Sequence, residues 1–262
     1  MKSAALFVGA VSLAAAMGCS ATAPTPPPTL TILAASSLQS SLSDLAAAWK
    51  RTHPTTALVT STGATSALRT QIEQGSPADV LLGADTTNAQ ALVDEQDAIG
   101  PVTRYATNEL TVIVPASNPK GIQTPADLAK AGVCVIAAGA DVPINKYAEQ
   151  LVANLAQRPE YGAAFEAGYE ANVCSREDNV GAVVNKISLD EGDAAIVYVT
   201  DAEAGSNLQQ VAVPADSNVL ATYGGVPVKA SANASAAADF LTWLTGSDAQ
   251  AVLKAHGFGA AP

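Results

Sequence analysis

Four places in the chain join an apolar, strand-like run to a short polar turn and then to a helical pattern. The first is residues 33–38 (LAASSL), where Ser36 and Ser37 follow the apolar residues 30–33. The first N–H groups of a helix lack partners within the helix, and the helix dipole adds partial positive charge there. With hydroxyls beside them, such corners can hold an anion without a basic residue. A serine that only caps its helix explains one corner equally well.

The other three corners repeat this chemistry further along the chain. Thr65 and Ser66 precede a helical pattern that stops at Gly75, Ile144 follows Pro143 after an apolar run, and Asn179 precedes another helical pattern. Each corner alone also fits a capped helix or a simple turn, and Arg176 in the fourth fits a pair with a nearby carboxylate. Corners on successive βα units can face one crevice at the carboxyl ends of the strands. Together they predict an anion-binding cleft.

Tyr198 lies within the apolar run 194–199. A buried tyrosine hydroxyl usually finds a hydrogen-bond partner. The sequence leaves two partners open, a backbone acceptor in the core and a ligand.

Ser36 or Ser37 could instead be the nucleophile of an exported hydrolase. Such a serine needs a general base. The histidines, His53 and His256, lie in no catalytic motif, and Gly-x-Ser-x-Gly is absent from the sequence. The sequence therefore favours a binding protein over an enzyme. A purely adhesive surface lipoprotein is a third interpretation.

The elements that would position these residues alternate between strand and helix, which is typical of an α/β fold. The clearest helix follows the first corner, with apolar side chains at helical spacing and an end at Pro54. We expect Ser37 to cap this helix. The apolar positions of this helix are Leu38, Leu42, Leu45, Ala46 and Trp49.

The N-terminus reads as an export signal. Residues 1–18 hold one lysine and a short apolar run, which is typical of a signal peptide and too short for the roughly 20 residues of a membrane span. Residues 16–19 (AMGC) resemble a bacterial lipobox, so we expect lipidation of Cys19 and anchoring at the outer face of the membrane. Ala16 stands where leucine is usual, and a plain signal peptide is the alternative. Residues 19–29, rich in proline, form an extended tether.

Charge and cysteines narrow the class of protein further. The net charge of −11 argues against binding of nucleic acid, which needs clustered basic residues. Cys134 and Cys174 belong to an exported, oxidising setting and favour an intrachain disulfide. Two buried thiols are the alternative. Neither cysteine lies at metal-ligand spacing.

The corners, in this order, resemble the periplasmic molybdate-binding proteins of bacterial ABC transporters, over residues 29 to about 258. The resemblance implies an α/β, two-lobed type II periplasmic-binding-protein fold with the ligand in the interlobe cleft. Each lobe would be a mostly parallel sheet flanked by helices. Residues 30–110 and 217–262 would form lobe 1, and residues 111–216 lobe 2. The matching segments are residues 33–38, 63–68, 71–79, 142–143, 177–179 and 196–202.

The family's ligand contacts carry over residue by residue. Ser37 and Thr65 would give hydroxyl and N–H groups, Ile144 and Asn179 backbone N–H groups, and Tyr198 its hydroxyl. Thr65 stands where serine is common. A shift of one residue would substitute Ser66 for Thr65 or Val180 for Asn179. Molybdenum would enter only as the bound oxyanion, with no direct protein ligand and no other cofactor.

The resemblance implies a monomeric, extracytoplasmic lipoprotein that captures molybdate, and tungstate as well, for an ABC permease. Sulfate or another oxyanion is the alternative ligand. Burial of an oxyanion costs several kcal/mol for each lone pair left without a donor. A ring of donors fitted to one anion can therefore reject a smaller one of equal charge.

Overall fold

The computed structural model describes residues 29–262. The expected signal peptide (residues 1–18), the lipidation at Cys19 and all but the last residue of the tether lie outside the described residues. Thr29, which was expected to end the tether, is the first residue of strand β1. Within residues 29–262, no helix is both long and apolar enough to cross a membrane.

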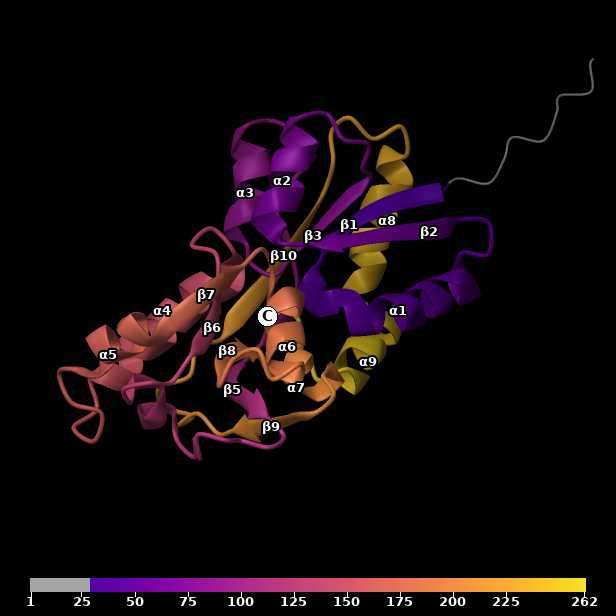
Figure 1. The fold of residues 1–262 in the computed structure, drawn as a ribbon. Helices are drawn as coiled ribbons and strands as arrows, with labels where there is room; N and C mark the ends of the chain where they lie inside the picture. Colours follow the sequence, from indigo (N-terminus) through magenta and orange to yellow (C-terminus); the bar gives the residue numbers. More distant parts are fainter. Residues whose placement is uncertain (1–28) are drawn as a thin grey trace, which may run out of the picture.

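The first sheet has the strand order β2-β1-β3-β10-β4. β1 (Thr29–Ala35) pairs in parallel with β2 (Ala57–Gly63) and with β3 (Val80–Gly83). β10 (Ala221–Pro227) runs antiparallel to β3 and to β4 (Thr103–Asn108). The sheet thus joins strands from the two ends of the described chain (Figure 1).

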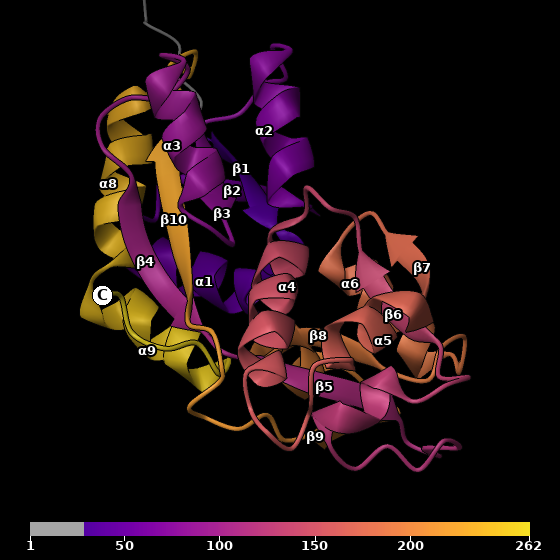
Figure 2. The same ribbon diagram turned by 90° about the vertical axis from the view of Figure 1, so that its left-hand side faces the viewer.

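Helices cover both faces of the first sheet, as Figures 1 and 2 show. Alternate side chains of one strand point to opposite faces, so Ile32 packs in the core under α1 and α8, and Leu33 packs with α2 and α3. The elements on these faces are η1 (Ser36–Leu38), α1 (Gln39–Thr52), α2 (Thr65–Glu73), α3 (Thr87–Asp94), α8 (Ala234–Leu244) and α9 (Ser247–Ala255).

The second sheet combines a two-stranded group and a three-stranded group of strands. β6 (Val135–Ala138) pairs in parallel with β7 (Val173–Glu177), and β5 (Leu110–Pro115) is antiparallel to β8 (Ala195–Tyr198) and β9 (Leu208–Val211). A parallel bridge between Val135 and Ala194 connects the two groups of strands. Its helices are η2 (Pro125–Ala129), α4 (Pro143–Ala156), α5 (Phe165–Asn172), α6 (Val180–Ser188) and α7 (Val199–Ala204).

Both sheets are mixed rather than mostly parallel. In each sheet, every antiparallel pair of strands includes the same strand. This strand is β10 in the first sheet and β5 in the second. The chain enters each of these strands directly from the other sheet, whereas parallel neighbours need a long crossover within one sheet. Chain exchange between the lobes therefore sets the strand directions.

The chain changes sheets at Glu109 and between β9 and β10. Leu110 already belongs to β5 in the second sheet. The expected lobe boundaries, at residues 110/111 and 216/217, stay a prediction, because membership of a sheet does not by itself delimit a folding unit.

Cys134 and Cys174 form a disulfide with their Cα atoms 5.3 Å apart. The bond joins the start of β6 to the edge strand β7. The favoured interpretation of these two cysteines is thereby confirmed.

Candidate functional site

A small cavity lies where the polar corners of the two sheets meet. Four of the five expected ligand residues line it, namely Ser37, Thr65, Ile144 and Tyr198. Figure 2 shows the first turn of α4 close to the first turn of α2. The cavity has a volume of about 10 Å³, which is roughly the room that one water molecule needs. Its remaining lining residues are Ala35, Ser36, Gly63, Ala64, Ala84, Val142, Pro143 and Val180.

Three helices, α2, α4 and α6, begin beside this cavity. The residues before α2 and α4, Ala64 and Val142, offer no side-chain cap. Ile144 and Val180 lie in the first turns of α4 and α6, where a backbone N–H has no intrahelical acceptor. The helix dipoles add partial positive charge at the same point.

Asn179, expected among the ligand contacts, does not line the cavity. Its backbone is extended (φ −162°, ψ 167°), and its side-chain oxygen accepts a hydrogen bond from the Ala182 N–H at 3.0 Å. Asn179 is therefore the N-cap of α6. The first helical residue, Val180, takes the place beside the cavity, as the alternative register proposed.

Ser37 is not the helix cap that the sequence predicted. It lies within the short helix η1, and neither η1 nor α1 has a side-chain cap. The Ser37 Oγ instead lies 2.8 Å from the Tyr223 Oη. The Asn108 Nδ2 donates to this same Tyr223 oxygen at 3.2 Å and to the Thr200 Oγ1 at 2.8 Å. Tyr223 can thus give its proton to Ser37, which leaves the Ser37 proton for an acceptor in the cavity.

The Thr65 hydroxyl is also oriented so that its proton can be donated to an acceptor. The Ala84 N–H donates to the Thr65 Oγ1 at 3.0 Å, so the hydroxyl proton of Thr65 is free for an acceptor. The threonine methyl has its space because position 83 is glycine. A Cβ added to Gly83 would lie 2.8 Å from the Thr65 Cγ2.

Tyr198 carries the strongest sign of a missing acceptor. Its side chain is 1% exposed, and its hydroxyl has no hydrogen-bond partner among the described residues. Burial, followed by the neighbouring Tyr223 and Tyr147, raises the pKa of Tyr198 well above its usual value, so the hydroxyl keeps its proton. A buried polar group without a partner costs about 1–3 kcal/mol. Of the two partners left open by the sequence, a ligand fits this geometry.

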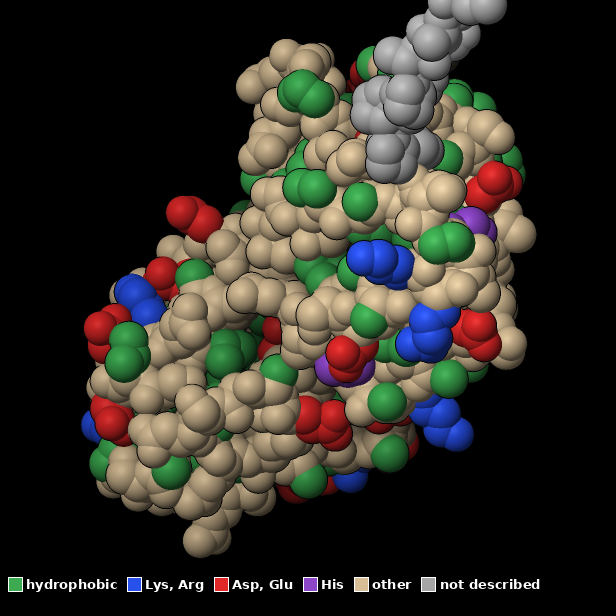
Figure 3. Space-filling view, turned by 90° about the vertical axis from the view of Figure 1, so that its right-hand side faces the viewer, with side chains coloured by type: hydrophobic (Ala, Val, Ile, Leu, Met, Phe, Trp, Pro, Cys, Tyr) green, Lys and Arg blue, Asp and Glu red, His purple; other side chains and the backbone are tan. Residues whose placement is uncertain are grey.

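The described lining of the cavity contains no cationic side chain, since none of its residues is lysine or arginine. Arg176, in the fourth corner, pairs with Glu170 and donates to the Asn145 Oδ1, which is the carboxylate pairing the sequence allowed. On the face shown in Figure 3, lysine and arginine side chains are scattered among acidic ones.

The two histidines, both among residues 29–262, make their contacts away from the serines. His53 stacks on Trp49 and bonds to the Thr52 hydroxyl, and the His256 Nε2 lies 2.9 Å from Asp44. These contacts of His53 and His256 do not include Ser36 or Ser37. Residues 29–262 also hold no cluster of histidine, cysteine or carboxylate side chains suited to a metal ion.

A family profile described as bacterial extracellular solute-binding protein matches residues 30–259. The chain belongs to this family. It is a transport binding protein rather than an enzyme, and it acts outside the cytoplasm.

Curated relatives match this solute-binding protein along nearly its whole length. The molybdate-binding protein ModA of Mycobacterium tuberculosis is 26% identical over 261 residues, covering 96% of this chain and 95% of the relative. ModA of Escherichia coli is 29% identical over 238 residues, covering 87% of this chain and 88% of the relative.

Solved structures show the same fold. The periplasmic molybdate-binding protein of Azotobacter vinelandii superposes with a TM-score of 0.73 at 22% identity, covering 89% of this chain and all of that one. The sulfate-binding protein SubI of Mycobacterium tuberculosis gives 0.78 at 20% identity, covering 88% and 86%. The solute-binding protein thus has the two-lobed type II periplasmic-binding-protein fold that the sequence predicted.

Proposed function

We propose that this protein captures molybdate, and tungstate as well, outside the cytoplasm and delivers it to the permease of an ABC transporter. The observation that carries the proposal is the buried, unpartnered hydroxyl of Tyr198. It faces the same cavity as Ser37 and Thr65 and the starts of α4 and α6. Relatives named as molybdate-binding proteins support the choice of anion.

The donors come from both lobes, so the anion bridges them. η1 and α2 belong to the first sheet's lobe, whereas α4, α6 and Tyr198 belong to the second. A tetrahedral oxyanion needs more room than one water molecule, so the corners must separate by a small hinge motion to admit it. Contacts from both sides then hold the lobes together.

Selectivity follows from the absence of a cation among the described lining residues. Attraction of a full positive charge would treat sulfate and molybdate alike. Neutral donors at fixed positions instead favour the anion whose oxygens reach all of them. The larger molybdate and tungstate ions can satisfy donors that sulfate would leave unpaired.

Calorimetric titration of the full chain with molybdate, tungstate and sulfate tests this assignment. We expect molybdate and tungstate to bind more tightly than sulfate. The Tyr198→Phe variant should lose about 10- to 100-fold in molybdate affinity, because a hydrogen bond to a charged group contributes about 1.5–3 kcal/mol. Tyr169→Phe, a buried tyrosine on α5, is the matched control and should bind normally. Tighter binding of sulfate would contradict the choice of ligand.

The membrane attachment is part of the same proposal. We infer that residues 1–18 are removed, that Cys19 is lipidated and that the monomer is held at the outer face of the membrane. Support comes from the lipobox-like residues 16–19 and from the extracellular family. A Cys19→Ser variant should move from the membrane fraction to the soluble fraction after cell lysis, with unchanged molybdate affinity. Retention of that variant in the membrane fraction would exclude the lipid anchor.

A further inference from the structure

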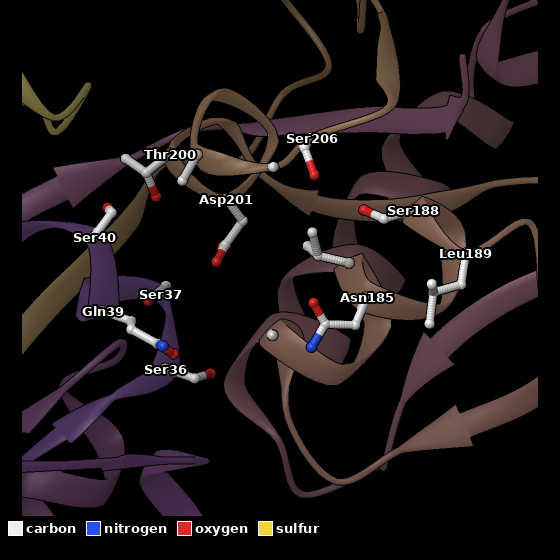
Figure 4. Close-up of a pocket in the computed structure, with 14 residues that line it drawn as sticks. Ser36, Ser37, Gln39, Ser40, Asn185, Ser188, Leu189, Thr200, Asp201 and Ser206 are labelled. Carbon is white, nitrogen blue, oxygen red and sulfur yellow. The ribbon is translucent and has the colours of Figure 1, made fainter.

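A second, larger pocket adjoins the anion cavity. It has a volume of about 610 Å³ and shares Ser36 and Ser37 with the small cavity. η1 and the start of α1 form one side, and α6 and α7 form the other. Figure 4 shows Asp201 directed into this pocket from α7, between Gln39 on α1 and Asn185 on α6. Of the described residues that line the pocket, Asp201 alone has an ionisable side chain.

Asp201 is a buried carboxyl group without a partner. Asp201 is 9% exposed, and its Oδ2 makes no hydrogen bond among the described residues. Asp201 lies in the first turn of α7, where the helix dipole normally favours a carboxylate. Burial outweighs that effect and raises the pKa of Asp201 to about 8. The neutral acid is therefore the main form at pH 7.

The charge of Asp201 reaches the hydroxyls around the anion cavity. Asp201 follows Tyr198 by three residues at the junction of β8 and α7. After burial, a negative Asp201 is the next cause that raises the pKa of Tyr223, and it also contributes to the raised pKa of Tyr198. An anion among these hydroxyls would feel the same charge, because buried charges are poorly screened.

The other described residues that line the pocket around Asp201 have uncharged side chains. η1 and α1 present Ser36, Ser37, Gln39 and Ser40, and α6 presents Asn185 and Ser188. The tyrosines of β8 and β10 that face Asp201 have pKa values raised well above 10. Glu203, on the same helix α7, lies against Gly257, where an added Cβ would be 2.3 Å from the Glu203 Oε2.

We propose that Asp201 is a determinant of anion affinity whose carboxyl group must be neutral for the oxyanion to bind tightly. The inference rests on the proposed function. When an anion enters at alkaline pH, the Asp201 Oδ2 takes up one proton from the buffer and forms an O–H bond. When Asp201 gives this proton back to the buffer, its negative charge repels the anion.

The test compares the full chain, its Asp201→Asn variant and the control Glu203→Gln. Molybdate, which stays a dianion over this range, is titrated by calorimetry between pH 6.5 and 9.5. Above pH 8, wild-type affinity should fall by up to about tenfold for each pH unit, the slope expected for uptake of one proton. Glu203→Gln should follow the wild type, whereas Asp201→Asn should keep its pH 7 affinity throughout. Equal pH dependence in Asp201→Asn and wild type would overturn the proposal.

A second measurement does not depend on the folding of a variant. Titrations of the wild type at pH 8.5, in two buffers of different ionisation enthalpy, give the number of protons taken up per anion. We expect between half a proton and one proton, and an uptake near zero would overturn the proposal. Tight binding of molybdate without proton uptake leaves the proposed function intact. If neither molybdate nor sulfate binds at pH 7, the proposed function and the role of Asp201 are both wrong.

Discussion

The hydroxyl of Ser37 lies 2.8 Å from the hydroxyl of Tyr223, although 186 positions separate the two residues. Asn108 donates to the same Tyr223 oxygen. Contrary to the sequence prediction, Ser37 therefore does not cap a helix. Its contact with Tyr223 instead orients its hydroxyl as a hydrogen-bond donor. The binding geometry of the first corner thus depends on a strand near the other end of the chain.

Tyr223→Phe should weaken molybdate binding by about three- to tenfold. The variant removes the tyrosine hydroxyl that orients Ser37 but keeps the Ser37 hydroxyl itself. Ser37→Ala should cost more, about 10- to 100-fold, because the donor itself is removed. Calorimetric titration measures both affinities, and circular dichroism checks the fold. A larger loss in Tyr223→Phe than in Ser37→Ala would contradict this order of roles.

Thr65 offers a pair of matched substitutions. Thr65→Val keeps the shape and removes the hydroxyl, so molybdate affinity should fall by about 10- to 100-fold. Thr65→Ser keeps the hydroxyl, loses only the methyl group beside Gly83 and should bind within a few-fold of the wild type. Equal affinities in titrations of the two variants would show that the Thr65 hydroxyl does not contact the anion.

Position 180 allows a backbone donor to be removed directly. Val180→Pro deletes the N–H, and proline is well tolerated at the first helical position after an extended residue such as Asn179. We expect a loss of about tenfold or more in molybdate affinity, measured by titration, with Val180→Ala as the control for the side chain.

Asn179→Ala should instead lower the free energy of unfolding by about 1 kcal/mol, the usual cost of a lost cap, and should leave molybdate affinity almost unchanged.

The disulfide contributes to stability rather than to binding. Replacement of both Cys134 and Cys174 by serine should lower the free energy of unfolding by about 2–4 kcal/mol in urea denaturation. Both residues lie outside the cavity lining, so molybdate affinity of the folded double variant should be unchanged. A large loss of affinity would show that this bond also positions the α4 or α6 corner.

Asp201 makes a separate prediction about stability and pH. Its pKa is about 8 in the folded protein and close to the ordinary 3.8 in the unfolded chain. Between these values the folded state holds the extra proton, so its stability falls as the pH rises from about 4 to 8 and is lowest above 8. Asp201→Asn removes this loss. Thermal melts should show no stabilisation by Asp201→Asn at pH 4 and an increasing one up to pH 8.

Local sequence patterns determined most of the elements and most of the donors. The apolar spacing after Ser37 predicted helix α1, and the pattern after Asn179 predicted α6, because a buried helical face needs a regular repeat. The corners at Ser37, Thr65 and Ile144 could be recognised because helix starts and hydroxyls are local features, whereas the choice of these residues as ligand contacts came from the resemblance to molybdate-binding proteins. The setting of the two cysteines likewise favoured their disulfide.

The sequence patterns missed elements that exist through distant partners. β4 (Thr103–Asn108) has little apolar alternation and forms a strand by pairing with β10, which lies more than a hundred residues later. The short helices α5 and α7 have too few turns for a clear repeat. The directions of β5 and β10 were also missed, because they follow from the passage of the chain between the two sheets.

Tertiary structure alone decided how the site works. No local pattern shows that the Tyr198 hydroxyl is buried without a partner, that Tyr223 orients Ser37, or that the Asp201 Oδ2 is buried without a hydrogen bond among the described residues. Each of these properties depends on which groups from distant segments fill the surrounding space. The sequence therefore determined which donors exist and on which corners, whereas packing decided which of them remain free for an anion.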